Sequence, residues 1–190
     1  MIPSPSTIVG TVWTVLLVVW VLAAITAKRA VRREFGPARL AQLIVLASAW
    51  ALLSRSSSEF GALNHRFVPD VPAVGWIGVA LVLAGAAFAI WARFTIGSNW
   101  SGTITVKTDH ELQTSGPYAI VRHPIYSGLL LTLLGTALVV GEWRAVAALA
   151  LAFVGWRWKS LIEERVMTEQ FGDAYEDYKR RVKALIPFVV

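Results

Sequence analysis

The sequence predicts an all-α, polytopic membrane protein with five transmembrane helices. Three observations support this fold class: a strongly apolar composition, five apolar runs, and basic residues that gather between alternate runs. Hydrophobic residues make up 56% of the 190 residues and charged residues only 16%, whereas soluble domains average about 45–50% and about 25%. The mean hydropathy of +0.58 agrees with this difference. The balance excludes a soluble globular domain, and it also excludes an extended disordered chain.

Five apolar runs are the candidate membrane spans. They cover residues 7–27, 38–53, 74–94, 125–140 and 143–158. A helix needs about 20 residues to cross about 30 Å of hydrocarbon, so the first and third runs are long enough unaided. The other three need flanking residues or a locally thinner bilayer. A buried helix of a soluble protein is the alternative for each short run, but five such runs in one chain favour a membrane protein.

The Lys and Arg residues test the number of spans. Three of the 18 basic residues, Arg55, Arg66 and Arg144, fall on one side of the predicted membrane, and the other 15 fall on the opposite side. Because Lys and Arg collect in cytoplasmic loops, this segregation supports five spans and predicts an outside N-terminus and a cytoplasmic C-terminus. The net charge of +6 is therefore a signal of topology, and nucleic-acid binding has little support.

The residues that the chain lacks exclude several kinds of chemistry. It contains no cysteine, which excludes disulfides, thiolate zinc sites and a cysteine nucleophile. Its three histidines, His65, His110 and His123, are scattered along the sequence, so no metal site is expected. The sequence has neither a P-loop nor a glycine-rich dinucleotide motif after a strand.

The last two apolar runs are separated only by Gly141 and Glu142, which predicts an antiparallel helical hairpin. After the hairpin, Phe171 and Gly172 are expected to end a helix, and residues 173–183 are expected to form an amphipathic C-terminal helix. Such a helix lies on a membrane surface or caps the hairpin. One face of it carries apolar or aromatic side chains: Tyr175, Tyr178 and Val182.

Two polar clusters flank the predicted hairpin. The first, at the entry of the fourth run, contains Arg122, His123 and Tyr126 around Pro124. Proline suits the first turn of a helix, and the free N–H groups of that turn favour an anion. The second cluster is the pair Glu163-Glu164 with Lys159 before it, and a carboxylate near the hydrocarbon edge is costly unless it is paired or functional.

The hairpin is expected to bring both clusters to the same face of the membrane. Together they suit a cytoplasmic pocket for a zwitterion, in which the cations bind a carboxylate and the glutamates bind an ammonium group. The alternative is a structural network of salt bridges between a helix cap and the C-terminal helix. The residues alone leave both interpretations open.

An ordered set of motifs covers about two-fifths of the chain, from residue 110 to residue 188. It consists of His110-Glu111-Leu112-Gln113-Thr114-Ser115-Gly116-Pro117-Tyr118, Arg122-His123-Pro124 with Tyr126 and Gly128, Glu163-Glu164, Phe171-Gly172, Tyr175, Tyr178, Arg181-Val182 and Pro187. In order and spacing this set resembles the isoprenylcysteine carboxyl methyltransferase family and its phospholipid methyltransferase relatives. The first hundred residues match only as generic membrane spans.

The resemblance implies an integral membrane methyltransferase that uses S-adenosylmethionine and acts on a lipid-like acceptor. The expected acceptor is the carboxylate of an isoprenylcysteine-like or related isoprenoid substrate. The alternatives are a phospholipid amine N-methyltransferase, an NADPH-dependent membrane reductase and a non-catalytic lipid-binding membrane protein. Residues 1–190 are expected to form one integral membrane domain, with residues 95–190 as its cofactor-binding and catalytic half. The expected partners are a lipid or prenylated substrate and membrane lipids, without nucleic acid or metal.

The resemblance also implies the roles of individual residues. The expected cofactor-binding residues are His110, Glu111, Leu112, Gln113, Tyr118, His123, Pro124, Ile125, Tyr126, Glu163 and Glu164. Glu163 would bind the ammonium group of the methionine moiety. The prenylcysteine enzymes orient the acceptor carboxylate with an arginine four residues before that glutamate, where this chain has Lys159, a point charge without the planar guanidinium. Lys159 and Arg122 are therefore the expected catalytic residues, and Arg157 is a further cation nearby.

The chemistry of the donor favours a carboxylate acceptor over an amine. A sulfonium methyl group is already activated, so the enzyme mainly has to align the reactants, an effect worth about 7–11 kcal/mol. A carboxylate is ionised at neutral pH and needs no general base. An amine must first lose a proton, and only His123 or a glutamate is a candidate base.

Overall fold

The computed structural model describes residues 3–25, 37–54, 60–97 and 112–189. Within these residues the structure is helical, and the β pairing there is limited to two isolated bridges. The predicted all-α class is therefore confirmed. The described part of the chain holds six α-helices: α1 (Pro5–Ile25), α2 (Pro37–Ser54), α3 (Pro72–Ile96), α4 (Pro124–Val140), α5 (Trp143–Phe171) and α6 (Asp173–Arg181).

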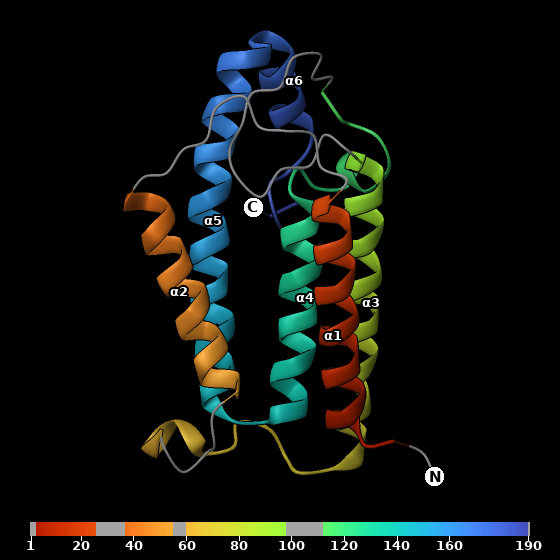
Figure 1. Cartoon of the computed structure of the whole chain (residues 1–190), viewed down its shortest axis with the longest axis vertical. Helices are drawn as coiled ribbons and strands as arrows, with labels where there is room; N and C mark the ends of the chain where they lie inside the picture. The colour runs from red at the N-terminus through yellow and green to blue at the C-terminus, as the bar shows by residue number, and fades with distance from the viewer. Residues whose placement is uncertain (1–2, 26–36, 55–59, 98–111, 190) are drawn as a thin grey trace.

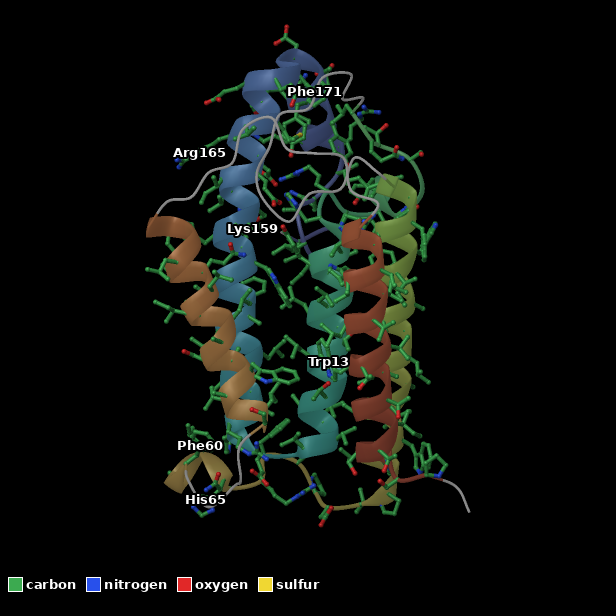
Figure 2. All side chains as sticks on the ribbon, in the orientation of Figure 1. Trp13, Phe60, His65, Lys159, Arg165 and Phe171 are labelled. Atoms are coloured by element: carbon green, nitrogen blue, oxygen red, sulfur yellow. The ribbon has the colours of Figure 1, made fainter. Side chains whose placement is uncertain are left out.

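The helices form an elongated bundle. Helices α1, α3 and α4 pack together, whereas α2 packs along α5 (Figure 1). α6 lies at one end of the bundle, where α4 begins and α5 ends, and the short connection between α4 and α5 lies at the other end (Figure 1). Trp13 joins α1 to α4 because its indole Nε1 donates a hydrogen bond to Thr136 Oγ1 at 3.1 Å (Figure 2).

Length and composition identify the helices that suit a membrane. Pro5–Ala23 of α1, Pro72–Ile96 and Trp143–Phe171 are long and apolar enough to cross it, and Leu40–Ser54 and Pro124–Val140 are shorter apolar helices. Large apolar side chains point away from the bundle, as at Leu17, which is 65% exposed, and Trp50, which is 59% exposed. Such outward apolar surface is expected where lipid is the solvent. The fold is thus that of a multi-pass membrane protein, while the count of five spans stays a prediction.

The last long helix extends beyond its predicted apolar run. The hydrophobic run ends at Trp158, but α5 continues to Phe171, because most of the residues that follow are strong helix formers, although many of them are polar. The predicted stop at Phe171 and Gly172 is confirmed, and Gly172 has a φ of 51°, which favours glycine. α6 ends at Arg181 rather than at residue 183, because the chain becomes extended at Val182.

Helices α3 and α4 approach each other so closely that only glycine fits at their contacts. A Cβ atom added to Gly128 would lie 2.6 Å from the backbone nitrogen of Ala89, and one added to Gly85 would lie 2.5 Å from that of Thr132. These neighbours are backbone atoms of packed helices and cannot rotate aside. Small residues at such crossings allow membrane helices to pack closely, and here they set the position of α4.

We therefore expect Gly128→Ala to lower the free energy of unfolding by about 1–3 kcal/mol, the usual effect of an overpacked core. Thermal unfolding of the purified protein in detergent measures this change. Gly10→Ala in α1 is the matched control, because no atom lies within 4 Å of its added Cβ. Equal stability of the two variants would show that the close approach of α3 and α4 does not stabilise the fold.

The connection between α4 and α5 is fixed at the end of the bundle opposite α6. Arg144 donates to the carbonyl oxygens of Leu52 at 2.7 Å and Leu53 at 3.2 Å, and its Nε donates to Glu142 Oε2 at 2.6 Å. The guanidinium thereby satisfies carbonyl groups that the last turn of α2 leaves without partners. Gly141 ends α4 with a φ of 74°. The tight connection places the start of α4 and the polar end of α5 at the same end of the molecule.

Candidate active site

The start of α4 is held against the C-terminal tail, the segment that follows α6. The backbone N–H of Arg122 donates to the carbonyl of Lys183 at 2.8 Å, and that of His123 donates to the carbonyl of Ala184 at 2.9 Å. Pro124 occupies the first turn of α4, where a missing N–H is tolerated. These contacts fix the direction in which the first side chains of α4 point toward α5.

Glu163 of α5 faces three possible donors. The hydroxyl of Tyr126 donates to its Oε1 at 2.8 Å, and His123 Nδ1 lies 3.5 Å from its Oε2. Lys159 Nζ, one helical turn earlier on α5, lies 3.7 Å from Oε1. The side chain of Glu163 is 21% exposed. Glu163 is therefore a carboxylate that the protein orients but does not fully cover.

The neighbouring Glu164 is bound in a different way. Its Oε1 accepts hydrogen bonds from Arg122 Nε at 3.1 Å and Nη2 at 2.7 Å, and His123 Nε2 lies 3.1 Å away. The side chains of Arg122 and Glu164 are each only 9% exposed. Arg122 Nη1 also donates to the carbonyl oxygens of Lys179 and Val182. The Arg122–Glu164 ion pair therefore joins α4, α5 and the tail.

His123 lies between the two glutamates. Burial by itself lowers the pKa of His123, but the hydrogen bonds of its ring to Glu163 and Glu164 outweigh burial, so its pKa is raised above the ordinary value. Both ring nitrogens donate only when the imidazole is protonated. The cluster therefore favours a cationic His123 that orients both carboxylates.

The rings of His123, Tyr126 and Trp156 form a stack between the start of α4 and α5. The ring of Tyr126 is nearly parallel to that of His123, with centroids 5.6 Å apart, and to that of Trp156, with centroids 6.1 Å apart. Lys159 Nζ lies 5.6 Å from the centroid of the Tyr126 ring. The stacked rings limit the rotation of Tyr126 and so keep its hydroxyl on Glu163.

The C-terminal helix packs on α5, and its aromatic face also contacts the short turn Gly116–Ala119 that precedes α4. Tyr175 and Tyr178 are each only 3% exposed, as the predicted amphipathic face requires. Tyr178 donates its hydroxyl to the carbonyl of Tyr118 at 2.5 Å. Burial raises the pKa of Tyr178, so its hydroxyl keeps the proton that this bond needs. α6 thus covers the polar end of the hairpin.

The comparisons with known proteins place this arrangement in a family. A model of the phospholipid methyltransferase family matches residues 74–174, more than half of the chain. The chain belongs to the phospholipid methyltransferase family. The matched region contains α4 and α5 with both glutamates, and α3 except for its first two residues.

Individual relatives of this protein have names that are more specific than that of the family. Protein-S-isoprenylcysteine O-methyltransferase B of Arabidopsis thaliana is 32% identical over 131 residues, which are 65% of this chain and 66% of the relative. The Homo sapiens protein-S-isoprenylcysteine O-methyltransferase is 32% identical over 135 residues, which are 67% of this chain and 47% of that protein. The chain thus spans between about half and two thirds of the length of these relatives.

A solved structure supports the same assignment. The eukaryotic intramembrane Ras methyltransferase, isoprenylcysteine carboxyl methyltransferase, matches with a TM-score of 0.59 and 27% sequence identity. The match covers 82% of this chain and 54% of the solved chain. The phospholipid methyltransferase family member therefore shares its helical arrangement with a membrane methyltransferase.

In this phospholipid methyltransferase family member, only some of the predicted site residues contact one another. Glu163 contacts His123, Tyr126 and Lys159, and Ile125 belongs to an apolar cluster with Ala92 of α3, against which Tyr126 also packs. Glu164 contacts Arg122 and His123. Pro124 is buried, Tyr118 belongs to the cluster of Ile125, Leu112 is half-buried, Gln113 Nε2 donates to Ser115 Oγ at 2.8 Å, and His110 and Glu111 lie outside the described residues.

The site also contains a residue that the sequence analysis did not predict. Trp156 was not a predicted site residue, although it lies seven residues before Glu163 and so on the same face of α5. His65 lies at the end of the molecule opposite Lys159 (Figure 2). Among the residues that the structure describes, no group of His, Asp or Glu side chains could hold a metal ion.

The raised pKa of His123 predicts a pH-dependent stability of this phospholipid methyltransferase family member. A histidine with a raised folded-state pKa stabilises the fold fully below its unfolded value of 6.5, and this contribution is lost as the pH rises through the folded value. We expect the melting temperature in detergent to fall as the pH rises above 6.5, and His123→Gln to flatten that fall. His65→Gln is the control and should leave it intact. An unchanged pH profile in His123→Gln would contradict the assignment.

Proposed function

We propose that this protein is an integral membrane methyltransferase that uses S-adenosylmethionine as its methyl donor and acts on a lipid-like acceptor. The observation that carries the proposal is the partly exposed carboxylate of Glu163, which Tyr126, His123 and Lys159 orient at the polar end of the hairpin. Family membership supplies the class of reaction, and this carboxylate supplies a place for a charged ligand.

The residues at the polar end of the hairpin fit the two charged groups on the methionine moiety of S-adenosylmethionine. Its ammonium group suits Glu163, since an ammonium donates strong charge-assisted hydrogen bonds to a carboxylate. Its carboxylate suits the first turn of α4, where Pro124 is followed by backbone N–H groups at the positive end of the helix. When bound, the donor supplies a methyl group on a sulfonium centre. The role of the chain is to align the acceptor with that group and to exclude water.

We assign the remaining predicted residues by the contacts that they make. His123 and Tyr126 hold Glu163. The proposed contacts of the methyl donor are His123, Tyr126, Leu112, Gln113, Tyr118, Pro124 and Ile125. Arg122 and Glu164 bind each other and the tail, which favours a positioning role over direct contact with a ligand. Lys159 is the proposed cation for the acceptor.

The acceptor that we propose is the carboxylate of an isoprenylcysteine-like substrate. A carboxylate is already ionised, and the Nζ atom of Lys159, which lies 3.7 Å from Glu163 Oε1, would orient it beside the donor. A phospholipid amine is the second candidate, and it is favoured by the name of the matching family model. An amine requires a base, and a protonated His123 does not serve as one.

Lys159→Met should raise the KM for a carboxylate acceptor about tenfold, the usual effect of losing a charge-assisted hydrogen bond. Lys159→Arg should restore the KM, because guanidinium binds carboxylate in a bidentate manner. Methyl transfer to an isoprenylcysteine analogue at varied acceptor concentration measures both variants. A normal KM in Lys159→Met would rule out this residue as the cation that binds the acceptor.

We also propose five spans with the N-terminus outside and the C-terminus in the cytoplasm. The support is that Arg66 and Arg144 lie at the end of the α4–α5 connection, while Lys159 and Arg165 lie toward the other end. Because the chain has no cysteine, single cysteines placed at His65 and at Asp173 can be labelled from either side of a sealed vesicle. Labelling of both positions from one side would contradict this topology.

The central experiment is to measure donor binding and methyl transfer with the purified protein in detergent. Calorimetry with S-adenosylhomocysteine tests the donor site. Labelled S-adenosylmethionine, offered with an isoprenylcysteine analogue or with phosphatidylethanolamine, tests the acceptor. Absence of binding at high micromolar concentration would overturn the proposed function. Methylation of phosphatidylethanolamine alone would replace the first acceptor with the second.

A further inference from the structure

The tail ends in apolar side chains that the described part of the protein leaves uncovered. Ala184 and Leu185 are 2% and 1% exposed, whereas Ile186 is 42%, Phe188 95% and Val189 67% exposed. The tail is therefore packed against the bundle as far as Leu185. The apolar residues after it do not contribute to that core.

These residues form a defined turn. The backbone N–H of Val189 donates to the carbonyl of Ile186 at 3.1 Å, and Phe188 has a φ of 65°. A proline at the second position followed by a residue with positive φ is the pattern of a type II turn. A bulky residue is unfavourable at a positive φ. The turn nevertheless has phenylalanine at this position, so an aromatic ring lies at its tip.

The residue before the turn is held at the first turn of α4, beside a candidate membrane span. Ser127 of α4 donates its hydroxyl to the carbonyl of Leu185 at 2.5 Å. Ile125, two residues before Ser127, belongs to an apolar cluster against which Trp20 of α1 packs. Trp20 lies inside the candidate span Pro5–Ala23. The chain therefore returns from α6 to the level at which α1 is still apolar.

Basic side chains precede the turn. Arg180, Arg181 and Lys183 are exposed, and they follow the acidic first turn of α6. Basic residues near a membrane are attracted to anionic headgroups. An apolar tip with a basic flank is the usual composition of a segment that inserts into the surface of an anionic bilayer.

We propose that residues 186–189 form a membrane anchor that inserts into the bilayer surface at the α6 end of the molecule, with Phe188 in the lipid and the basic residues before it at the headgroups. The anchor would hold α6 and the tail against the start of α4. The proposal concerns the lipid bilayer and is independent of methyl transfer, so it can fail while the proposed function holds.

The absence of cysteine from the chain allows a direct test. Phe188→Cys in the full chain is labelled with an environment-sensitive fluorophore and reconstituted in vesicles of phosphatidylcholine and phosphatidylglycerol. We expect its emission to be blue-shifted, quenched by doxyl-labelled phosphatidylcholine and protected from aqueous iodide. Asp173→Cys, an exposed position at the start of α6, is the matched control and should show the emission and iodide quenching of a dye in water.

Two results would overturn the anchor. A fluorophore at position 188 that iodide quenches as readily as at position 173 would show that the turn lies in water. A fluorophore protected from both iodide and doxyl lipid would show that the turn packs against protein, either on this chain or on a second copy. Binding of S-adenosylhomocysteine by the same labelled protein reports separately on the proposed function.

Discussion

Glu163→Gln will weaken the binding of S-adenosylhomocysteine about 100-fold, or roughly 3 kcal/mol, the upper range for a hydrogen bond to a charged group. Glutamine keeps the size of the side chain and leaves an oxygen that can accept from Tyr126. It removes the negative charge that we propose for the ammonium group of the ligand. Calorimetry of the purified protein in detergent measures the loss.

The control for this variant lies on the same helix. Glu169→Gln removes an equal charge from an exposed position of α5 and should bind S-adenosylhomocysteine like the unchanged protein. Thermal unfolding without ligand shows whether either variant has lost its fold. If Glu163→Gln is folded and binds normally, Glu163 is not the partner of the ammonium group, and the donor site must be sought elsewhere in the chain.

Local patterns in the sequence were sufficient to predict the main features of the fold. Hydropathy identified the apolar helices, the two residues Gly141 and Glu142 set the connection between α4 and α5, and glycine at position 172 marked the end of α5. Hydropathy underestimated the length of α5, because it identifies the apolar part of a helix and not the polar part that follows. The last 13 residues of α5 are more polar than the apolar run before them, yet their helix propensity continues the helix.

The division of roles between the two glutamates was not predictable from the sequence. Adjacent residues on a helix point about 100° apart, so Glu163 and Glu164 must face different surroundings. Which of them meets Arg122 depends on where the tail returns to α4, a contact between residues 122 and 183. The sequence predicted that six charged or polar groups converge and left open whether they bind a ligand or each other, whereas the structure distinguishes a partly exposed carboxylate at Glu163 from the buried Arg122–Glu164 ion pair.

Arg122→Met will lower the free energy of unfolding by about 3–5 kcal/mol, because breaking a buried ion pair leaves the charge of its partner poorly compensated, here with only His123 beside Glu164. Glu164 loses two hydrogen bonds, and the carbonyl groups of Lys179 and Val182 lose their guanidinium donor. The tail should then separate from α4. Thermal unfolding in detergent measures the change, and protease cleavage after Lys183 should become faster.

Arg165→Met is the control, because Arg165 is exposed on α5 and points away from the bundle (Figure 2); its stability should stay within about 0.5 kcal/mol of the unchanged protein. The double variant Arg122→Met/Glu164→Leu separates the effect of an unpaired charge from the loss of packing. Replacing both members of a buried pair with apolar residues is often neutral, so the double variant should be more stable than Arg122→Met alone. The double variant could instead be less stable than Arg122→Met. That result would show that the contact of Glu164 with His123 holds the tail in place more than the charge balance between Arg122 and Glu164 does.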